Sequence, residues 1–90
     1  MRSVKLKIYG KVQGVYFRVH TQENARQLSL NGYVKNCPDG TVEALAEGDD
    51  KNVEAFIEWC RKGPIEASVL RVDIHESTVK NYSGFAILRD

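Results

Sequence analysis

The sequence has 90 residues, with 13 Lys and Arg against 12 Asp and Glu and a formal net charge of +1 at pH 7. A chain of this length supports one hydrophobic core, so we expect residues 1–90 to form a single domain. Its 42% hydrophobic and 28% charged residues exclude a disordered or fibrous protein, and the near balance of charge argues against a nucleic-acid partner.

The first ten residues predict a strand, because Val4, Leu6 and Ile8 alternate with polar or aromatic residues at the period of two that a half-buried strand shows. The same alternation leaves no continuous apolar run for a signal peptide. No later segment is long and apolar enough to span a membrane either. We therefore expect a cytosolic protein with no membrane partner.

The segment GKVQGVYFR, residues 10–18, separates this strand from a predicted helix. Gly10 and Gly14 allow the backbone to adopt positive φ or to approach another group closely. The N–H groups of residues 14–18 could then form a concave nest for an anion, with the guanidinium of Arg18 as a planar fork for phosphate oxygens. The same pattern is also typical of two turn glycines followed by an arginine on a helix surface, for example one paired with Glu23.

The helix after this segment is predicted to end before Gly32, because side chains of its apolar face recur at near-helical spacing: Phe17, Thr21, Ala25 and Leu28. Residues 33–35 and 41–47 have strand character. The turn residues Pro38-Asp39-Gly40 lie between them and predict a hairpin.

A second helix is expected to begin at the N-cap candidates Asp49 and Asp50 and to end at Gly63-Pro64. Strands are predicted at residues 70–74 and 85–87. The order β, α, β, β, α, β, β predicts an α+β, ferredoxin-like split β-α-β sandwich, with two helices packed on one face of a four- to five-stranded antiparallel sheet. In this topology the first two strands end at the same edge, which brings residues 14–18 close to Asn36.

Cysteine and histidine usage gives no sign of a disulfide framework or a metal site. Two cysteines, Cys37 and Cys60, are expected to be free thiols in a reducing compartment. His20 and His75 have no ligand-like spacing to either cysteine, so we expect no metal. Because Cys37 follows Asn36 directly, oxidation of this thiol could affect a site built around Asn36.

Four segments of the sequence resemble the acylphosphatase family, and together they cover nearly the whole chain. GKVQGVYFR is similar to the signature loop of that family, and NGYVKNCPDGTVEALAEG, residues 31–48, is similar to its second signature. GPIEASVLRV and GFAILR are similar to its downstream segments. The resemblance implies a hydrolase without metal or cofactor that cleaves the carboxyl-phosphate mixed anhydride of acyl phosphates. It assigns phosphate binding to Arg18 and positioning of the attacking water to Asn36.

Hydrolysis of an acyl phosphate needs no strong general acid, because the leaving carboxylate has a conjugate acid with a pKa of about 4. The site must neutralise the phosphoryl oxygens and hold a water in line with the bond that breaks. We expect the phosphate of a small-molecule substrate, or a phosphate or sulfate ion, to bind at one set of residues: Gly14, Val15, Tyr16, Phe17 and Arg18. Gln13 completes the loop, and Thr41 could support Asn36 from beyond the hairpin turn.

Two other functions remain open at the level of the sequence. Sheets of this topology can bind nucleic acid through exposed aromatic residues, here Tyr9 and Tyr33, although an aromatic-rich strand is absent. Alternatively, the chain could be a regulatory module that uses the loop to sense a phosphorylated ligand without hydrolysing it. Asn36 could also be the first turn residue of the hairpin, a position where Asn is favoured. We expect a monomer.

Overall fold

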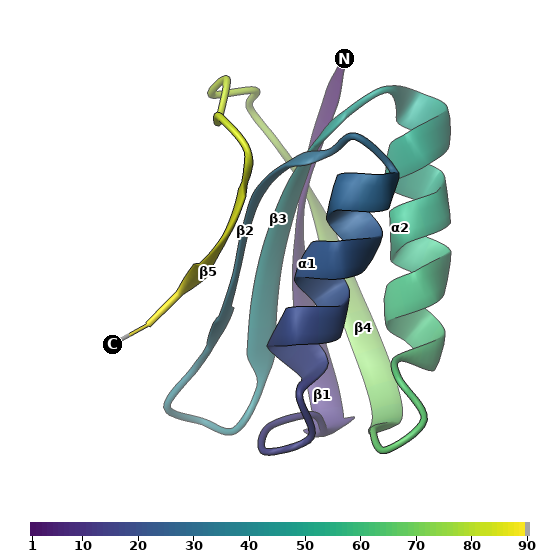
Figure 1. The fold of residues 1–90 in the computed structure, drawn as a ribbon, viewed down its shortest axis with the longest axis vertical. Helices are drawn as coiled ribbons and strands as arrows, with labels where there is room; N and C mark the ends of the chain where they lie inside the picture. The colour runs from purple at the N-terminus through teal and green to yellow at the C-terminus, as the bar shows by residue number, and fades with distance from the viewer. Residues whose placement is uncertain (90) are drawn as a thin grey trace.

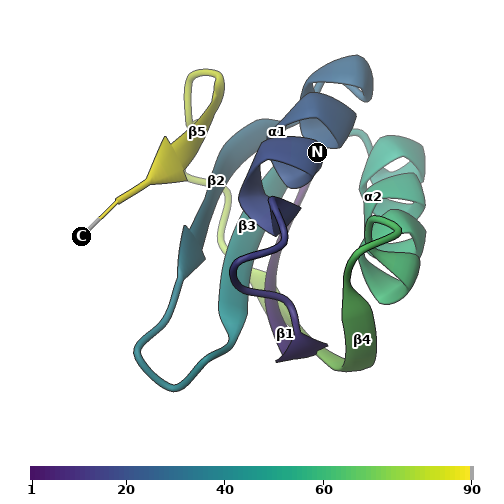
Figure 2. The same ribbon diagram turned by 60° about the horizontal axis from the view of Figure 1, so that its bottom comes forward.

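The computed structural model describes residues 1–89, which form one five-stranded sheet covered on one face by two helices (Figures 1 and 2). The elements in chain order are β1 (Arg2–Lys11), α1 (Phe17–Gln27), β2 (Asn31–Asn36), β3 (Val42–Gly48), α2 (Asp50–Lys62), β4 (Ser68–Ser77) and β5 (Phe85–Leu88). The predicted ferredoxin-like α+β fold is confirmed.

The strands lie in the order β4-β1-β3-β2-β5. β1 pairs antiparallel with both β3 and β4, so Leu6 lies opposite Ala44 on one side and Ile74 on the other. β2 pairs antiparallel with β3, whereas the short β5 pairs in parallel with β2. This last pairing refines the expectation of an antiparallel sheet. It arises because the chain crosses from β4 at one edge to the far side of β2 before β5 begins.

The core lies between the helices and the sheet and follows the period-two pattern of the sequence. The side chains of Val4, Leu6 and Ile8 are fully buried on the helix-covered face. α2 contributes a row of buried residues at helical spacing, as predicted: Val53, Phe56, Ile57 and Cys60. Both cysteines are free, as expected, and burial raises the pKa of the Cys60 thiol.

α2 begins and ends where the sequence predicts, but the expected N-cap hydrogen bond is not formed. Asp49 is the N-cap residue of α2, but its side chain makes no capping hydrogen bond. The helix ends at Gly63, whose φ of 71° few other residues adopt. No helix within residues 1–89 has the length and hydropathy needed to cross a membrane.

Glu47 is a carboxylate whose side chain lies on the open face of the sheet and is nevertheless only 1% exposed. Its oxygens accept hydrogen bonds from the backbone N–H groups of Lys80, at 2.7 Å, and Tyr82, at 3.1 Å. Glu47 therefore fixes the crossover between β4 and β5. Burial opposes ionisation of this carboxyl, but the hydrogen bonds from Lys80 and Tyr82 outweigh it and lower the pKa.

Candidate active site

Gly10 and Gly14, the two glycines of the segment after β1, differ in what requires them. Gly10 has a φ of 128° and lies at a break in the β1–β4 register, where a Cβ would overlap the carbonyl oxygen of Ser68. Gly14 has a φ of 75° and open space where a Cβ would lie. Gly10 is thus required by the close approach of β4, whereas at Gly14 the backbone conformation is the constraint.

The loop between β1 and α1 alternates buried and exposed residues. Val15 is 8% exposed and Phe17 1%, and the Phe17 ring packs against Trp59 with centroids 5.7 Å apart. Gly14 and Tyr16 are exposed, and Tyr16 adopts left-handed backbone dihedrals, with φ 59° and ψ 24°. The apolar side chains therefore fix the loop to the core, while its backbone turns outward.

The backbone N–H groups of this loop are available to a ligand. The first backbone hydrogen bond of α1 is donated by His20 to the carbonyl of Tyr16. Within residues 1–89, no hydrogen bond to a protein acceptor is donated by the N–H groups of residues 14–19. A run of unpaired N–H groups at a helix N-terminus is a site for an anion, because the partial positive charge of the helix end adds to them.

A cavity of about 370 Å³ lies beside this loop, and it contains both residues that the sequence singled out as catalytic. Arg18 and Asn36 line the same cavity because β1 and β2 run in the same direction and finish at the same end of the sheet. Figure 2 shows these two strand ends on the side of the molecule that faces the viewer. Among the residues that the structure describes, nine line the cavity: Val12, Gly14, Tyr16, Phe17, Arg18, Val19, Asn36, Ile87 and Arg89.

Asn36 is the last residue of β2 and pairs with Val42, so it belongs to the strand and not to the hairpin turn. Its side-chain oxygen Oδ1 is buried and has no hydrogen-bond partner within residues 1–89. A buried acceptor without a partner costs about 1–3 kcal/mol, and such groups in a native structure call for a functional explanation. An oxygen of this kind beside an anion loop can accept a hydrogen bond from a bound water.

Arg18 and Arg89 both line the cavity. Within residues 1–89, neither takes part in an ion pair or a side-chain hydrogen bond, and Arg18 is not paired with Glu23. None of the nine lining residues is acidic. The cavity is therefore positively charged and suited to an anionic ligand.

Gln13 links the loop to the β2–β3 hairpin. Its side-chain Nε2 donates to the carbonyl oxygens of Cys37 and Thr41, each at 2.8 Å. These are the two residues that close the hairpin, because the N–H of Cys37 donates to the Thr41 carbonyl at 2.8 Å. Gln13 thus couples the position of the anion loop to the strand end that carries Asn36.

Thr41 lies within the hairpin turn and makes its side-chain hydrogen bond to Asp39. The Oγ1 hydroxyl and the backbone N–H of Thr41 both donate to Asp39 Oδ1, at 2.6 and 3.1 Å. No hydrogen bond between Thr41 and Asn36 is formed within residues 1–89. The Thr41 hydroxyl and an ion pair with Lys7 at 2.9 Å lower the pKa of Asp39.

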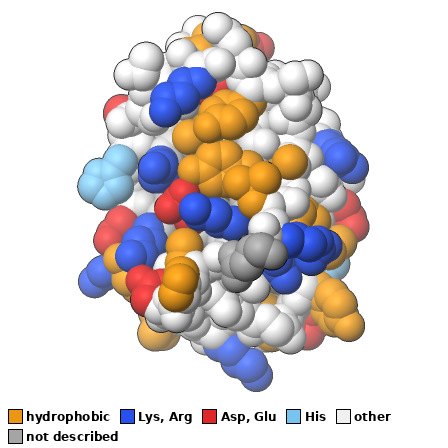
Figure 3. Space-filling view, turned by 90° about the vertical axis from the view of Figure 1, so that its left-hand side faces the viewer, with side chains coloured by type: hydrophobic (Ala, Val, Ile, Leu, Met, Phe, Trp, Pro, Cys, Tyr) orange, Lys and Arg blue, Asp and Glu red, His pale blue; other side chains and the backbone are white. Residues whose placement is uncertain are grey.

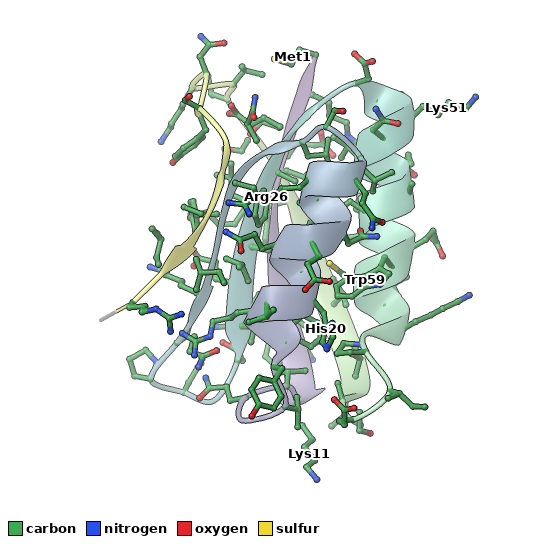
Figure 4. All side chains as sticks on the ribbon, in the orientation of Figure 1. Met1, Lys11, His20, Arg26, Lys51 and Trp59 are labelled. Carbon is green, nitrogen blue, oxygen red and sulfur yellow. The ribbon has the colours of Figure 1, made fainter. Side chains whose placement is uncertain are left out.

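Other residues weighed from the sequence lie outside the cavity. His20 lines a second cavity, of about 330 Å³, with Trp59 and the segment after α2 (Figure 4). Within residues 1–89, no cluster of His, Cys, Asp and Glu could hold a metal ion.

The two tyrosines considered for base stacking lie on the open face of the sheet but are covered. The Arg71 guanidinium lies over the Tyr9 ring at 4.1 Å, and Tyr33 packs edge-on against Tyr82 at 5.8 Å. The Tyr33 hydroxyl also donates to Glu43 at 2.6 Å. Figure 3 shows hydrophobic side chains packed together on the β5 side of the molecule, with Lys and Arg around them. Neither ring is presented as a free stacking surface, which weakens the nucleic-acid alternative.

Sequence reasoning missed Ile87 and Arg89 as pocket residues. Both belong to the segment GFAILR, which served as a marker of resemblance and as a predicted short strand but not as part of the site. The alternation of Phe85 and Ile87 was visible in the sequence, but which strand neighbours the short last strand was not.

Comparisons with known proteins agree with one another. The acylphosphatase family model matches residues 4–87. An acylphosphatase of Methylococcus capsulatus is 44% identical over 100% of this chain and 99% of its own, and one of Thermococcus kodakarensis is 47% identical over 92% and 91%. The crystal structure of acylphosphatase from Bacillus subtilis superposes with a TM-score of 0.96 at 34% identity, covering 99% of this chain and 100% of the other.

Proposed function

Because the chain belongs to the acylphosphatase family and so hydrolyses acyl phosphates, we propose that residues 14–18 bind the phosphate and that Asn36 positions the attacking water. The observation that carries this assignment is that Asn36, whose Oδ1 is buried and unpartnered within residues 1–89, lines the same cavity as Arg18. One group supplies positive charge and the other a free acceptor, and hydrolysis of this substrate needs both.

The phosphate of the substrate binds to the unpaired N–H groups of the loop and the first turn of α1. Arg18 adds a planar, permanently charged fork that can donate to two phosphoryl oxygens at once. Gly14, Val15, Tyr16 and Phe17 contribute backbone groups, so their side chains matter through the conformation of the loop. A free phosphate or sulfate ion binds in the same place.

The water is held by the carboxamide of Asn36, whose Oδ1 accepts a hydrogen bond from one O–H of the water without taking its proton. The water oxygen attacks phosphorus, the bond between phosphorus and the acyl oxygen breaks, and its electron pair leaves with the carboxylate. The proton released by the water passes to a phosphate oxygen or to solvent. Since the leaving carboxylate needs no proton, positioning and charge neutralisation are sufficient.

The test is the rate of benzoyl phosphate hydrolysis without added metal, for the parent, Arg18→Ala and Asn36→Ala. Loss of one preorganised group of this kind costs about 100-fold or more in kcat, so we expect both variants to fall by at least that factor. Competitive inhibition by inorganic phosphate separates the roles, since only Arg18→Ala should raise the inhibition constant strongly.

Two substitutions on α2 serve as controls. Arg61→Ala and Asn52→Ala remove the same side-chain types from positions that do not line the cavity, and we expect near-parental rates from both. Retained turnover in Asn36→Ala, or unchanged phosphate inhibition in Arg18→Ala, would overturn the role assigned to that residue.

We also propose that residues 1–90 form a single domain, that the protein is a monomer, and that it works in the cytosol. One sheet that includes all five strands supports the first point, and two free thiols are consistent with a reducing compartment.

A further inference from the structure

The lining of the cavity includes residues at the end of β5 and directly after it, in addition to the phosphate loop. Side chains alternate along a strand, so Phe85 and Ile87 of β5 project toward the same face, and Arg89 follows directly after the last strand residue, Leu88. Phe85 is buried in the core with its ring 5.9 Å from that of Phe56, and Ile87 is partly buried against the core. Packing of Phe85 and Ile87 holds the end of β5 beside the cavity, and Arg89 lines that cavity.

This end of the cavity combines an apolar wall with a cation. Val19 on α1 and Ile87 on β5 supply the apolar part of the wall, and Arg89 supplies the charge. Within residues 1–89, Arg89 has no ion-pair partner, and no lining residue carries a carboxylate that could neutralise it. Such an end is suited to an organic group that carries its own negative charge.

The size of the cavity leaves room for such a group. Its volume is about 370 Å³, whereas one water molecule in the liquid takes about 30 Å³. A phosphate fills only part of that space, and the lining beyond the phosphate loop includes Val19, Ile87 and Arg89.

We propose that Arg89 is a specificity-determining residue that binds a carboxylate on the acyl part of the substrate. The assignment rests on the proposed function, because it takes the phosphate to lie at the Gly14–Arg18 loop. The pocket then selects acyl phosphates that carry an anion at both ends: Arg18 binds the phosphate and Arg89 forms a bidentate pair with the distal carboxylate. The apolar wall of Val19 and Ile87 packs against the carbon skeleton that joins the two anions.

The test compares two substrates that differ by one group, benzoyl phosphate and carboxybenzoyl phosphate, the latter as its meta and para isomers. For the parent, we expect kcat/KM to be higher for at least one carboxybenzoyl phosphate isomer than for benzoyl phosphate. Arg89→Ala should reduce the ratio of kcat/KM for that isomer to kcat/KM for benzoyl phosphate about tenfold, chiefly by raising the KM of the carboxylated substrate. A factor of about ten is the effect expected from loss of a charge-assisted hydrogen-bonded pair. Arg89→Lys should restore part of the ratio, because the charge remains while the fork is lost.

Arg61→Ala is the matched control, since it removes an exposed arginine from the surface of α2 and should leave the ratio at its parental value. A parent that shows no preference for the carboxylated substrate would overturn the proposal. An equal loss for both substrates in Arg89→Ala would also overturn it, because Arg89 would then act on the phosphate or on the loop.

Binding of two non-hydrolysable phosphonates distinguishes failure of this proposal from failure of the catalytic assignment. Carboxybenzylphosphonate should bind more tightly than benzylphosphonate to the parent, and this difference should shrink in Arg89→Ala. If the parent hydrolyses neither substrate yet keeps that difference, the role of Arg89 stands and the catalytic roles of Arg18 and Asn36 fail. Equal affinity for the two phosphonates would overturn the role of Arg89 whatever the rates are.

Discussion

At the scale of single residues, the two glycines of the signature loop are required for different reasons, one for close packing and the other for backbone conformation. Gly10 lies against the backbone of β4, so any side chain there would displace a strand. Gly14 has open space beside it and a φ of 75°, so it restricts only which backbone conformation the residue can adopt. Sequence reasoning grouped both as loop glycines for an anion, and the structure assigns them different roles.

We therefore expect Gly10→Ala and Gly14→Ala to differ in stability. Overlap with a backbone carbonyl should make Gly10→Ala cost about 3 kcal/mol in the free energy of unfolding. Gly14→Ala should cost about 1 kcal/mol, the penalty for an L-residue in the left-handed region. Urea denaturation of both variants and the parent measures the difference, and equal losses would contradict the distinction.

Asn36 shows how a residue type alone leaves its role open. Asn before Pro-Asp-Gly is typical of a turn, and the sequence left the turn and the water site as alternatives. The structure places Asn36 at the end of β2 with a buried Oδ1 that lacks a partner. This observation depends on what surrounds the side chain, which no local pattern encodes.

At the scale of elements, the site depends on the link between the anion loop and the β2–β3 hairpin. Gln13 joins the two by donating to Cys37 and Thr41, and the turn itself is stabilised by Asp39. Arg18 lies at the end of the anion loop, whereas Asn36 lies at the end of β2, directly before the hairpin turn. Loss of this link should therefore change their relative position more than it changes the fold.

Gln13→Ala tests this link. We expect kcat for benzoyl phosphate to fall about tenfold or more, because small misplacement of catalytic groups is costly, while the free energy of unfolding falls by only about 1–2 kcal/mol. Parallel measurement of rates and urea denaturation separates the two effects. Rates that stay at the parental level would show that the hairpin keeps Asn36 in place without Gln13.

At the scale of the whole molecule, the crossover from β4 to β5 decides which strand borders β2. Glu47 is central to it, because a single buried carboxylate accepts hydrogen bonds from two backbone N–H groups of the crossing segment. The same segment brings β5, and with it Ile87 and Arg89, to the edge of the cavity. A residue far from the site thus helps to complete it.

Glu47→Gln should lower Tm at neutral pH by about 5–10 °C, because hydrogen bonds to a charged group are lost and about 1 kcal/mol shifts the Tm of a domain of this size by 4–8 °C. The folded-state pKa of Glu47 lies below its ordinary value of 4.5, so its stabilising contribution is present above that pH and is lost as the pH falls. Thermal unfolding from pH 7 to pH 3 measures this effect. The difference in Tm between parent and variant should narrow below pH 4.5, and a constant difference would argue against an ionised Glu47 in the folded state.

The sequence by itself determined the order of elements, the split topology and the meeting of residues 14–18 with Asn36, because periodicity and turn chemistry are local properties and the ends of β1 and β2 follow from them. Only the tertiary structure decided that β5 lies parallel to β2, that Gln13 reaches the hairpin, and that Arg89 borders the cavity. These features are contacts between segments distant in the chain. They depend on how distant segments pack against one another. A strand as short as β5 has too few residues for its sequence pattern to specify which strand it pairs with.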